Sequence, residues 1–191
     1  MKIIFLDFDG VINSETWMTS RWNEFDDETI HRNYPLYEFS PELVSNLNEI
    51  IEKTDAKIVV SSTWRKRRTI EELQGILSMI GVKGEVIGKT PVIGSIDGYT
   101  IPRGCEIQKW LKQEGKFQRI NWSADEQRKY MESAIVKSYV ILDDDSDMLF
   151  GQSEHFVQTS WKNGLEKHLA EKAIQILNTP LDKLYYNNSK N

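Results

Sequence analysis

Short apolar runs that end in polar or acidic turns recur along the chain and predict buried strands. The clearest runs are nearly continuous in Ile, Val, Leu or Phe and do not alternate with polar residues. Continuous runs of this length are typical of strands that are covered on both faces in a parallel sheet. The predicted strands cover residues 2–6, 57–60, 85–87, 138–142 and 156–158.

Longer segments between these runs carry apolar residues at helical spacing. One predicted helix begins with Ser40 as its N-cap, has proline at its first position and continues to about Lys53. A capping box at residues 69–72 opens another helix, which Gly81 ends. Further helices are predicted at 104–113, from Ser123 onward and at 165–177.

Strands that alternate with helices predict an α/β fold, a three-layer α/β/α, Rossmann-like domain with a doubly wound parallel sheet. A chain of 191 residues suits one such domain, which we place at 1–180. Residues 13–39 are aromatic, polar and aperiodic and predict a small flap or cap insertion, while 88–102 are rich in turn residues. Residues 181–191 predict a loosely held tail. In such sheets the functional crevice lies beyond the carboxyl ends of the strands.

Composition narrows the classes of function. The net charge of −5 argues against general affinity for nucleic acid or membranes but leaves room for a local basic patch. Cys105 is the only cysteine, which excludes an internal disulfide and suits a reducing cytosol. No apolar stretch is long enough to span a bilayer, and the first apolar run ends at Asp7 without a signal-peptide cleavage site. These features predict a cytoplasmic protein without membrane association and indicate no obligate protein partner.

Two carboxylates follow the first predicted strand, in the turn Asp7-Phe8-Asp9-Gly10. Gly10 can adopt backbone conformations that other residues resist, so both carboxylates can face one crevice. Two carboxylates about 4 Å apart repel each other by about 4 kcal/mol at an effective dielectric constant of about 20. The pair therefore requires a proton or a cation between its members. Alone, this short pattern is more typical of an exposed acidic turn.

A second acidic cluster follows the predicted strand at 138–142, at the same edge of the expected sheet. It contains Asp143, Asp144, Asp145 and Asp147. A hard divalent cation accounts for both clusters, because Mg²⁺ prefers oxygen ligands and is typically held by one or two carboxylates together with substrate phosphate. The two clusters therefore predict a magnesium-dependent site for phosphoryl transfer.

The order of these features resembles the haloacid dehalogenase (HAD) superfamily. An apolar strand followed by Asp-x-Asp-Gly-Val stands at residues 3–11, and a strand that ends in serine stands at 58–61. A strand that ends in aspartates stands at 140–144, with Asp147 further on, so the motifs span residues 3–147. The resemblance implies a HAD-like fold, a phosphatase activity and Mg²⁺ as the cofactor.

The resemblance also implies a role for each matching residue. Asp7 is the expected nucleophile, which forms an aspartyl-phosphate, and Asp9 is the expected acid/base partner. Ser61 is the expected phosphate ligand, with Ser62 and Thr63 as alternates. The expected metal ligands are Asp7, the backbone carbonyl of Asp9, Asp143 and Asp144.

A further HAD motif is a Lys or Arg near the start of the helix that precedes the last acidic strand. Arg103 matches it best and would offset the charge of the phosphoryl group, with Lys109, Lys112 and Lys116 as alternates. Arg103 lies farther upstream than is usual in the superfamily. The resemblance therefore implies that residues 116–137 form a helical insertion.

A basic run at 65–68 follows the second strand end, and its position makes Arg65 a candidate substrate contact, although a solvated face is the default for such a run. The segments Ser-Ser-Thr-Trp-Arg at 61–65 and Arg-Gly-x-Glu-Ile-x-x-Trp-Leu at 103–111, with the aspartates at 143–145, resemble phosphatase domains associated with nucleic-acid end repair. That resemblance implies a phosphorylated nucleotide or nucleic-acid end as the substrate. A phosphorylated small molecule is the alternative.

Other functions fit part of the pattern. A phosphotransferase or phosphomutase would use the same residues with a different acceptor. A catalytically silent relative would bind a phosphorylated ligand without turnover, which the intact Asp7 and Asp9 disfavour. A signalling receiver would need an acceptor aspartate near the strand end at which Ser61 stands. The leading prediction is therefore magnesium-dependent hydrolysis of phosphomonoesters.

Overall fold

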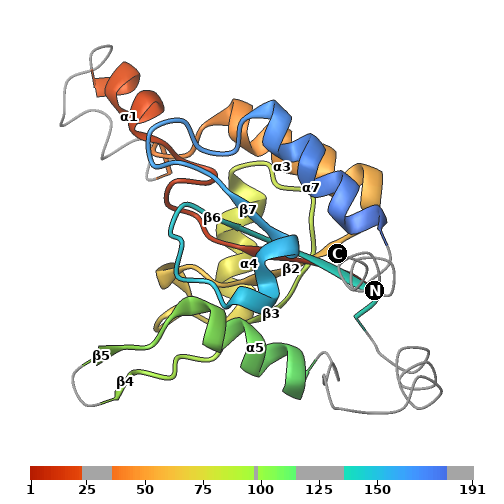
Figure 1. Ribbon diagram of the computed structural model, residues 1–191. Helices are drawn as coiled ribbons and strands as arrows, with labels where there is room; N and C mark the ends of the chain where they lie inside the picture. Colours follow the sequence, from red (N-terminus) through yellow and green to blue (C-terminus); the bar gives the residue numbers. More distant parts are fainter. Residues whose placement is uncertain (23–35, 97–98, 115–135, 180–191) are drawn as a thin grey trace.

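The computed structural model describes residues 1–22, 36–96, 99–114 and 136–179 (Figure 1). Several expectations fall outside these residues. They are residues 23–35 of the flap insertion at 13–39, the helix from Ser123 onward, most of the insertion at 116–137, the tail at 181–191 and the alternate cation Lys116.

The centre of the molecule is a five-stranded sheet in which every neighbouring pair of strands is parallel. Across the sheet, the strands are β3 (Val86–Lys89), β2 (Lys57–Val60), β1 (Lys2–Leu6), β6 (Ser138–Asp143) and β7 (Phe156–Gln158). β1 lies in the middle, with Phe5 in register with Val59 on one side and Ile141 on the other. The apolar runs form strands because both of their faces are buried. The predicted parallel sheet is confirmed.

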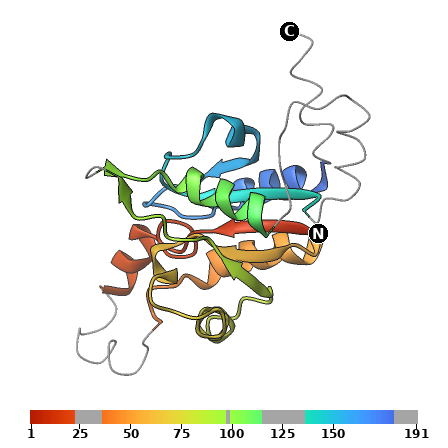
Figure 2. The ribbon, with the colours of Figure 1, turned by 90° about the horizontal axis from the view of Figure 1, so that it is seen from below.

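Helices cover both faces of this sheet, as a three-layer fold requires. On one face, α3 (Pro41–Thr54) and α7 (Lys167–Asn178) pack side by side, and α4 (Ile70–Met79) packs beside β3 (Figure 1). On the other face lies α5 (Arg103–Gln113), which Figure 2 places in front of the sheet. Within the described residues, none of the helices is both long and apolar enough to cross a membrane.

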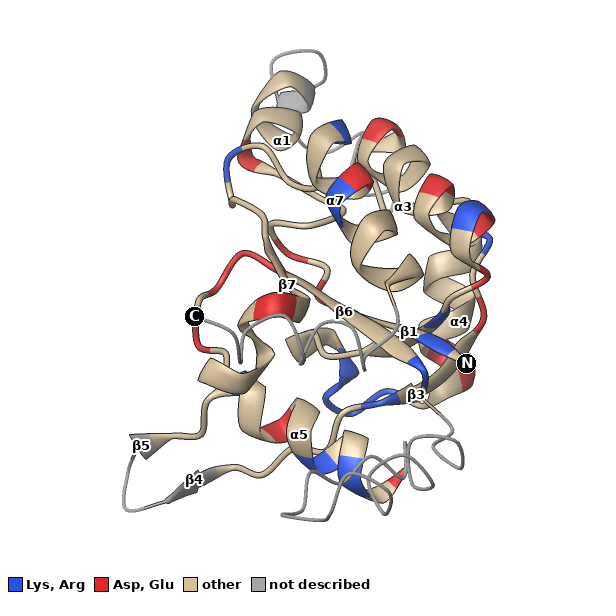
Figure 3. Ribbon diagram, turned by 45° about the vertical axis from the view of Figure 1, so that its right-hand side comes forward, with Lys and Arg blue, Asp and Glu red and all other residues tan. Residues whose placement is uncertain are grey.

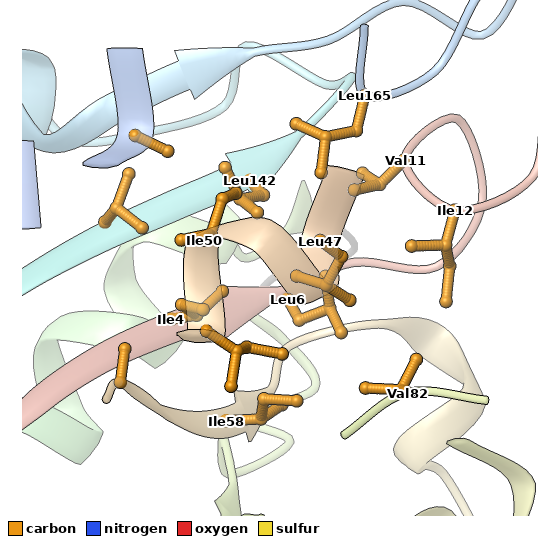
Figure 4. Packing of buried hydrophobic residues seen from close by; sticks show 14 of the residues in the cluster. Ile4, Leu6, Val11, Ile12, Leu47, Ile50, Ile58, Val82, Leu142 and Leu165 are labelled. Carbon is orange, nitrogen blue, oxygen red and sulfur yellow. The ribbon is translucent and has the colours of Figure 1, made fainter. Parts of the chain in front are cut away.

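The core has two layers because successive side chains of a strand point to opposite faces. Ile4 and Leu6 of β1 belong to the larger cluster, together with Leu47 and Ile50 of α3 (Figure 4). Phe5 belongs to the second cluster, on the side of α5. Burying each large apolar side chain contributes about 1.5–3 kcal/mol. With both faces packed, the strand ends are the part of the sheet left open to a ligand.

The predicted starts of α3 and α4 are confirmed. The Ser40 hydroxyl accepts a hydrogen bond from the Leu43 backbone N–H (3.4 Å). Both bonds of the capping box at α4 are present, because Thr69 Oγ1 accepts from the Glu72 N–H (3.2 Å) and Glu72 Oε2 accepts from the Thr69 N–H (2.7 Å). Each such cap contributes about 1 kcal/mol, so these helix starts are set locally.

The segment predicted to be aperiodic begins with a short helix, α1 (Glu15–Trp22). Its described side chains are exposed or half-buried, so the helix has no apolar stripe that a sequence pattern could reveal. The hydroxyl of Ser14 accepts a hydrogen bond from the Trp17 N–H (3.2 Å) and so caps its start. A bridge between Asn13 and Phe39 ties the two ends of the segment together.

Shorter elements complete the described chain. The turn-rich stretch contains a small antiparallel hairpin, β4 (Ser95–Ile96) and β5 (Tyr99–Thr100), which extends away from the sheet (Figure 1). Strands of two residues are too short to leave an alternating pattern in the sequence. Two 3-10 helices, η1 (Thr63–Arg65) and η2 (Phe150–His155), follow β2 and β6.

Candidate active site

Three of the predicted site residues lie at the carboxyl ends of three neighbouring strands, at one edge of the sheet. Asp7 follows β1, Ser61 follows β2 and Asp143 ends β6. Backbone hydrogen bonds continue the ladder past the strands: the Ser61 N–H donates to the Leu6 carbonyl (2.9 Å), and the Asp7 N–H donates to the Leu142 carbonyl (3.0 Å). The ladder therefore holds these three residues as neighbours.

Asp7, Asp143 and Asp144 form an acidic cluster in which one carboxylate oxygen from each residue lies within 4.8 Å of the others. Asp7 is 4% exposed and Asp143 is 0% exposed. Burial raises the pKa of Asp7, and burial together with the nearby Asp7 charge raises the pKa of Asp143 to about 8. Within the described residues, Oδ2 of Asp143 accepts no hydrogen bond of regular geometry, although Nε of Arg103 lies 3.1 Å away. Crowded, buried carboxylate oxygens are hard donors, so the acidic cluster fits a metal site.

The absence of a side chain at Gly10 allows Asp144 to pack close to the turn after β1. The φ of Gly10, 68°, is left-handed, and a Cβ at this position would lie 2.5 Å from Cγ of Asp144. The Gly10 N–H donates a hydrogen bond to Oδ1 of Asn13 (2.9 Å), which holds the turn in place. Glycine is therefore required both by the backbone conformation and by the close approach to Asp144.

Arg103, the first residue of α5, lies against the acidic cluster. Its Nη1 is 2.9 Å from Asp7 Oδ2, its Nε is 3.1 Å from Asp143 Oδ2, and Nη1 also donates to the Ser61 carbonyl (3.0 Å). Burial opposes the charge of Arg103, but the surrounding aspartates, Asp7 and Asp143 first among them, together outweigh it and raise the pKa of the guanidinium. The structure thus brings Arg103 to the predicted position.

The alternates to Arg103 on the same helix lie elsewhere. Lys109 and Lys112 are exposed, about two helical turns farther along α5. The start of the helix is held at the acidic loop because the Arg103 N–H donates to Asp147 Oδ2 (2.7 Å). Among the described candidates, Arg103 is therefore the cation that meets the aspartates.

Asp9 is half-buried and its two carboxylate oxygens have different partners. Nδ2 of Asn13 donates to Oδ1 (2.9 Å), and the indole Nε1 of Trp64 donates to Oδ2 (3.1 Å). These bonds aim the Asp9 carboxyl from two sides. Sequence reasoning missed both donors, because a lone Asn in a turn and a lone Trp after a strand carry no recognisable signal.

The three hydroxyl residues after β2 differ in what their side chains contact. Ser61 is 0% exposed, and its Oγ has no hydrogen-bond partner within the described part of the chain. The Ser62 hydroxyl hydrogen-bonds Asp7 and accepts a bond from the Trp64 N–H (3.3 Å). Thr63 is exposed. An unpartnered buried hydroxyl costs free energy unless it binds a ligand, which favours Ser61 over its alternates as a phosphate ligand.

Arg65 does not support the expectation of a substrate contact. Its side chain is 3% exposed and forms a buried ion pair with Glu106 of α5. Its Nε donates to the Thr90 carbonyl (3.0 Å), and its Nη1 donates to the Ser62 carbonyl (2.8 Å). A guanidinium that is buried and has four of its five N–H donors engaged within the protein is not presented to a substrate. Arg65 instead ties the ends of β2 and β3 to α5.

Comparison with known families identifies the chain. Residues 3–170 match the family described as the HAD domain in Swiss Army Knife RNA repair proteins. The chain belongs to this family. Membership in this HAD family implies phosphohydrolase-type chemistry, and the acidic cluster fits the metal site that such chemistry uses. No curated protein and no solved structure matches the chain.

Proposed function

We propose that the chain is a Mg²⁺-dependent phosphatase that removes a terminal phosphate from nucleic-acid ends. The observation that carries the proposal is the setting of Asp7. Its carboxylate contacts the guanidinium of Arg103 and lies close to the carboxylates of Asp143 and Asp144. A nucleophile in this setting has a cation beside it for the phosphoryl oxygens and donors for a metal ion.

The reaction has two steps that share one acid/base. In the first, a carboxylate oxygen of Asp7 attacks phosphorus, the bond from phosphorus to the leaving oxygen breaks, and Asp9 donates a proton to that oxygen. In the second, Asp9 takes a proton from water as the water oxygen attacks phosphorus. The bond between phosphorus and Asp7 then breaks, which releases inorganic phosphate and restores the carboxylate.

The neighbours of these two aspartates support this division of roles. Asn13 and Trp64 hold the Asp9 carboxyl by hydrogen bonds, so it can exchange its proton from a fixed position. The buried hydroxyl of Ser61 can donate to a phosphoryl oxygen, and Arg103 can offset the oxygen charge. These groups are in place before a substrate arrives, so little reorganisation is needed.

Three side chains and one carbonyl would hold the metal ion. They are Asp7, Asp143, Asp144 and the backbone carbonyl of Asp9. When bound, Mg²⁺ supplies charge that offsets the repulsion between the carboxylates and the phosphate. The close approach of the three carboxylates and the raised pKa of Asp143 support this assignment, because a divalent cation would offset the repulsion between them.

The substrate class rests on the family rather than on the acidic cluster. The description of the family as RNA repair proteins supports a nucleic-acid end as the source of the phosphate. A HAD site by itself constrains the chemistry more tightly than the substrate. A phosphorylated small molecule is therefore the comparison substrate in the test below.

The test is release of inorganic phosphate from RNA oligonucleotides phosphorylated at either end and from phosphorylated metabolites, with Mg²⁺ or with a chelator. We expect Mg²⁺-dependent turnover of the RNA ends and loss of all turnover in Asp7→Asn. Asp145→Asn is the matched control, because Asp145 is an exposed aspartate of the same acidic run.

Different results would reject different parts of the proposal. Substantial activity in Asp7→Asn would exclude Asp7 as the nucleophile. Preference for metabolites over RNA ends would reject the substrate class. Transfer of phosphate to an added alcohol in preference to water would indicate a phosphotransferase.

A further inference from the structure

A basic cleft lies beside the acidic cluster. It has a volume of about 540 Å³ and lies between the end of β3, the loop after β2 and α5. Its lining includes Lys66, Arg67 and Lys89, together with the apolar side chains of Ile87 and Trp110. Figure 3 shows Lys and Arg positions gathered between β3 and α5. We refer to this region as the basic cleft.

The basic cleft concentrates positive charge on a chain whose net charge is −5. Lys66 and Arg67 are exposed, so their charged groups are available to a ligand. Glu114 is the one acidic residue among the described residues of the lining. A local basic surface on an acidic protein attracts anions at that surface alone. The ligand that fits the cleft is therefore anionic, with an apolar part that can rest on Ile87 and Trp110.

The backbone of the loop holds these cations in position. Arg67 has a left-handed φ of 62°, which costs a residue with a side chain about 1 kcal/mol. Nζ of Lys89 donates to the carbonyl of Arg68, and Nη1 of Arg68 donates to the carbonyl of Trp64 (3.0 Å). Strain of this kind persists where surrounding contacts determine the conformation, often at ligand sites. These contacts hold the loop backbone, and so the positions from which the Lys66 and Arg67 side chains extend into solvent.

The basic cleft and the candidate active site share a wall. The Thr90 N–H donates to the Val60 carbonyl (2.9 Å), which places Thr90 of the cleft beside Ser61 on the neighbouring strand. Neighbouring strands are about 4.8 Å apart. The guanidinium of Arg65 spans the same gap, because it donates to the carbonyls of both Thr90 and Ser61. A chain bound at the Thr90 end of the cleft would therefore lie about one strand spacing from Ser61.

Thr90 also supplies an unpartnered polar group. It lines the basic cleft, is 2% exposed, and within the described residues its Oγ1 has no hydrogen-bond partner. A buried hydroxyl without a partner costs about 1–3 kcal/mol. A phosphate oxygen in the cleft would give this hydroxyl an acceptor.

From these observations we propose that the basic cleft binds the phosphodiester backbone of the RNA strand whose terminal phosphate reacts at Asp7. This inference rests on the proposed function and adds the path of the substrate. Lys66 and Arg67 contact backbone phosphates, Thr90 donates to a phosphate oxygen, and Ile87 and Trp110 support the sugar or base. These contacts are to phosphates and to the faces of sugars or bases, so we expect binding that does not depend on the base sequence.

The test compares two double variants with the same change in charge. Lys66→Gln with Arg67→Gln removes the two exposed cations of the cleft. Lys53→Gln with Lys172→Gln removes two exposed lysines of α3 and α7, on the opposite face of the sheet. All four residues are exposed, so both proteins are expected to fold, which thermal denaturation checks.

Binding is measured first, without turnover, by the fluorescence anisotropy of a labelled RNA oligonucleotide with a terminal phosphate on the Asp7→Asn background. For two single-strand phosphate contacts, the slope of log affinity against log salt is expected to fall by about 1.4, and affinity at about 0.1 M salt by about 10- to 25-fold. The variant on α3 and α7 is expected to match the parent protein. Equal affinity of the two double variants would overturn the proposal.

Turnover then separates this proposal from the proposed function. The cleft variant is expected to raise KM for the RNA and to leave hydrolysis of p-nitrophenyl phosphate unchanged, because that substrate does not reach the cleft. Weaker RNA binding by the cleft variant without any turnover by the parent protein would support the cleft and refute the phosphatase. Turnover of RNA ends that the cleft variant does not alter would support the phosphatase and refute the cleft.

Thr90→Val provides a second, independent variant. Valine has the shape of threonine without the hydroxyl, so the loss of an unpartnered buried group is expected to leave the melting temperature unchanged or higher. RNA affinity is expected to fall a few-fold by the same anisotropy measurement. Unchanged affinity would remove the Thr90 hydroxyl from the binding site.

Discussion

The indole Nε1 of Trp64 donates a 3.1 Å hydrogen bond to Oδ2 of Asp9, a residue 55 positions earlier in the chain. The ring of Trp64 packs against Phe8 and Phe39, with centroid separations of 5.6 and 5.3 Å. The acid/base residue of the proposed reaction is thus aimed by a side chain from the next strand end, and that side chain is itself held by aromatic packing.

Replacing Trp64 by Phe should keep most of the packing and remove the hydrogen bond. We expect kcat for RNA ends to fall about 10-fold with little change in KM, because a misdirected acid slows protonation of the leaving oxygen. The effect should be smaller with p-nitrophenyl phosphate, whose leaving group needs no proton. Trp161→Phe, at a position 46% exposed, is the control. Equal losses on both substrates would count against a role in positioning Asp9.

Gly10→Ala should weaken metal binding. The added Cβ would meet Cγ of Asp144 at 2.5 Å, and alanine resists a φ of 68°, so the Asp144 carboxylate must move. We expect the Mg²⁺ concentration for half-maximal activity to rise about 10-fold. Gly75→Ala in α4 is the control, because no atom lies within 4 Å of its Cβ position. That change should add about 0.5–1 kcal/mol to the free energy of unfolding. An unaltered Mg²⁺ requirement in Gly10→Ala would contradict the prediction.

Metal binding should also be visible as stability. An ion that binds only the folded protein adds about 2.7 kcal/mol at a concentration of about 100 times its dissociation constant. We expect Mg²⁺ to raise the melting temperature of the parent protein and of Asp145→Asn, and to have no effect on Asp143→Asn. A Mg²⁺ response that survives in Asp143→Asn would place the ion elsewhere.

Glu106→Gln should destabilise the protein strongly. The side chain of Glu106 is 10% exposed, pairs with the buried Arg65, and accepts a hydrogen bond from the Ile93 N–H (3.0 Å). Removing its charge leaves the Arg65 guanidinium buried without a counter-ion, which costs about 3 kcal/mol in the free energy of unfolding measured with urea. Glu49→Gln, which breaks the surface pairs with Lys53 and Lys167, should have a much smaller effect, because solvent screens exposed ion pairs. Similar losses in the two variants would reject this role for Arg65.

His155 should make stability depend on pH. The side chain is 0% exposed, stacks on the ring of Tyr139 at 3.9 Å, and has its pKa lowered to about 4 by burial, which the hydrogen bond to the Tyr139 carbonyl only partly opposes. The unfolded chain binds this proton near pH 6.5, so it binds more protons than the folded chain between about pH 6.5 and 4. The contribution of the neutral His155 to the free energy of unfolding is therefore fully present above about pH 6.5. It falls by about 3 kcal/mol as the pH is lowered to about 4.

The measurement is urea denaturation across that pH range in the parent protein, in His155→Phe and in His168→Gln, where His168 is exposed. We expect His155→Phe to lose less stability on acidification than the parent protein, and His168→Gln to behave like the parent protein. Parallel pH profiles for His155→Phe and the parent protein would refute the prediction.

Much of the fold can be predicted from the sequence, because the features that determine it lie within short segments of the chain. The strand at 2–6 is a continuous apolar run, and the helices at 41–54 and 70–79 begin with caps that their first few residues complete. The helix at 15–22 escaped prediction because the side chains described in it, at 15–20, form no buried stripe, and the hairpin at 95–100 because its strands have two residues each. Where a segment is held by contacts with distant residues, its own sequence pattern does not predict its structure.

Arg65 illustrates the same limit at the candidate site. In the sequence it belongs to a basic run, and a basic run beside a strand end suggests a substrate contact. In the structure its guanidinium turns inward to Glu106, which is 41 residues away, while Lys66 and Arg67 face solvent. In a run of like charges, the residue that becomes buried is the one with a partner of opposite charge nearby in space. The neighbouring residues in the sequence do not indicate where that partner lies.

The sequence by itself determined that Asp7, Ser61 and Asp143 stand at strand ends, because apolar runs and turn residues define strands locally and parallel strands share one carboxyl edge. Only the tertiary structure decided that Arg103 meets Asp7 and Asp143, that Trp64 and Asn13 aim Asp9, and that Lys66 and Arg67 border a cleft beside Ser61. These contacts depend on how helices and loops pack across the sheet, and that packing is set by side chains far apart in the chain.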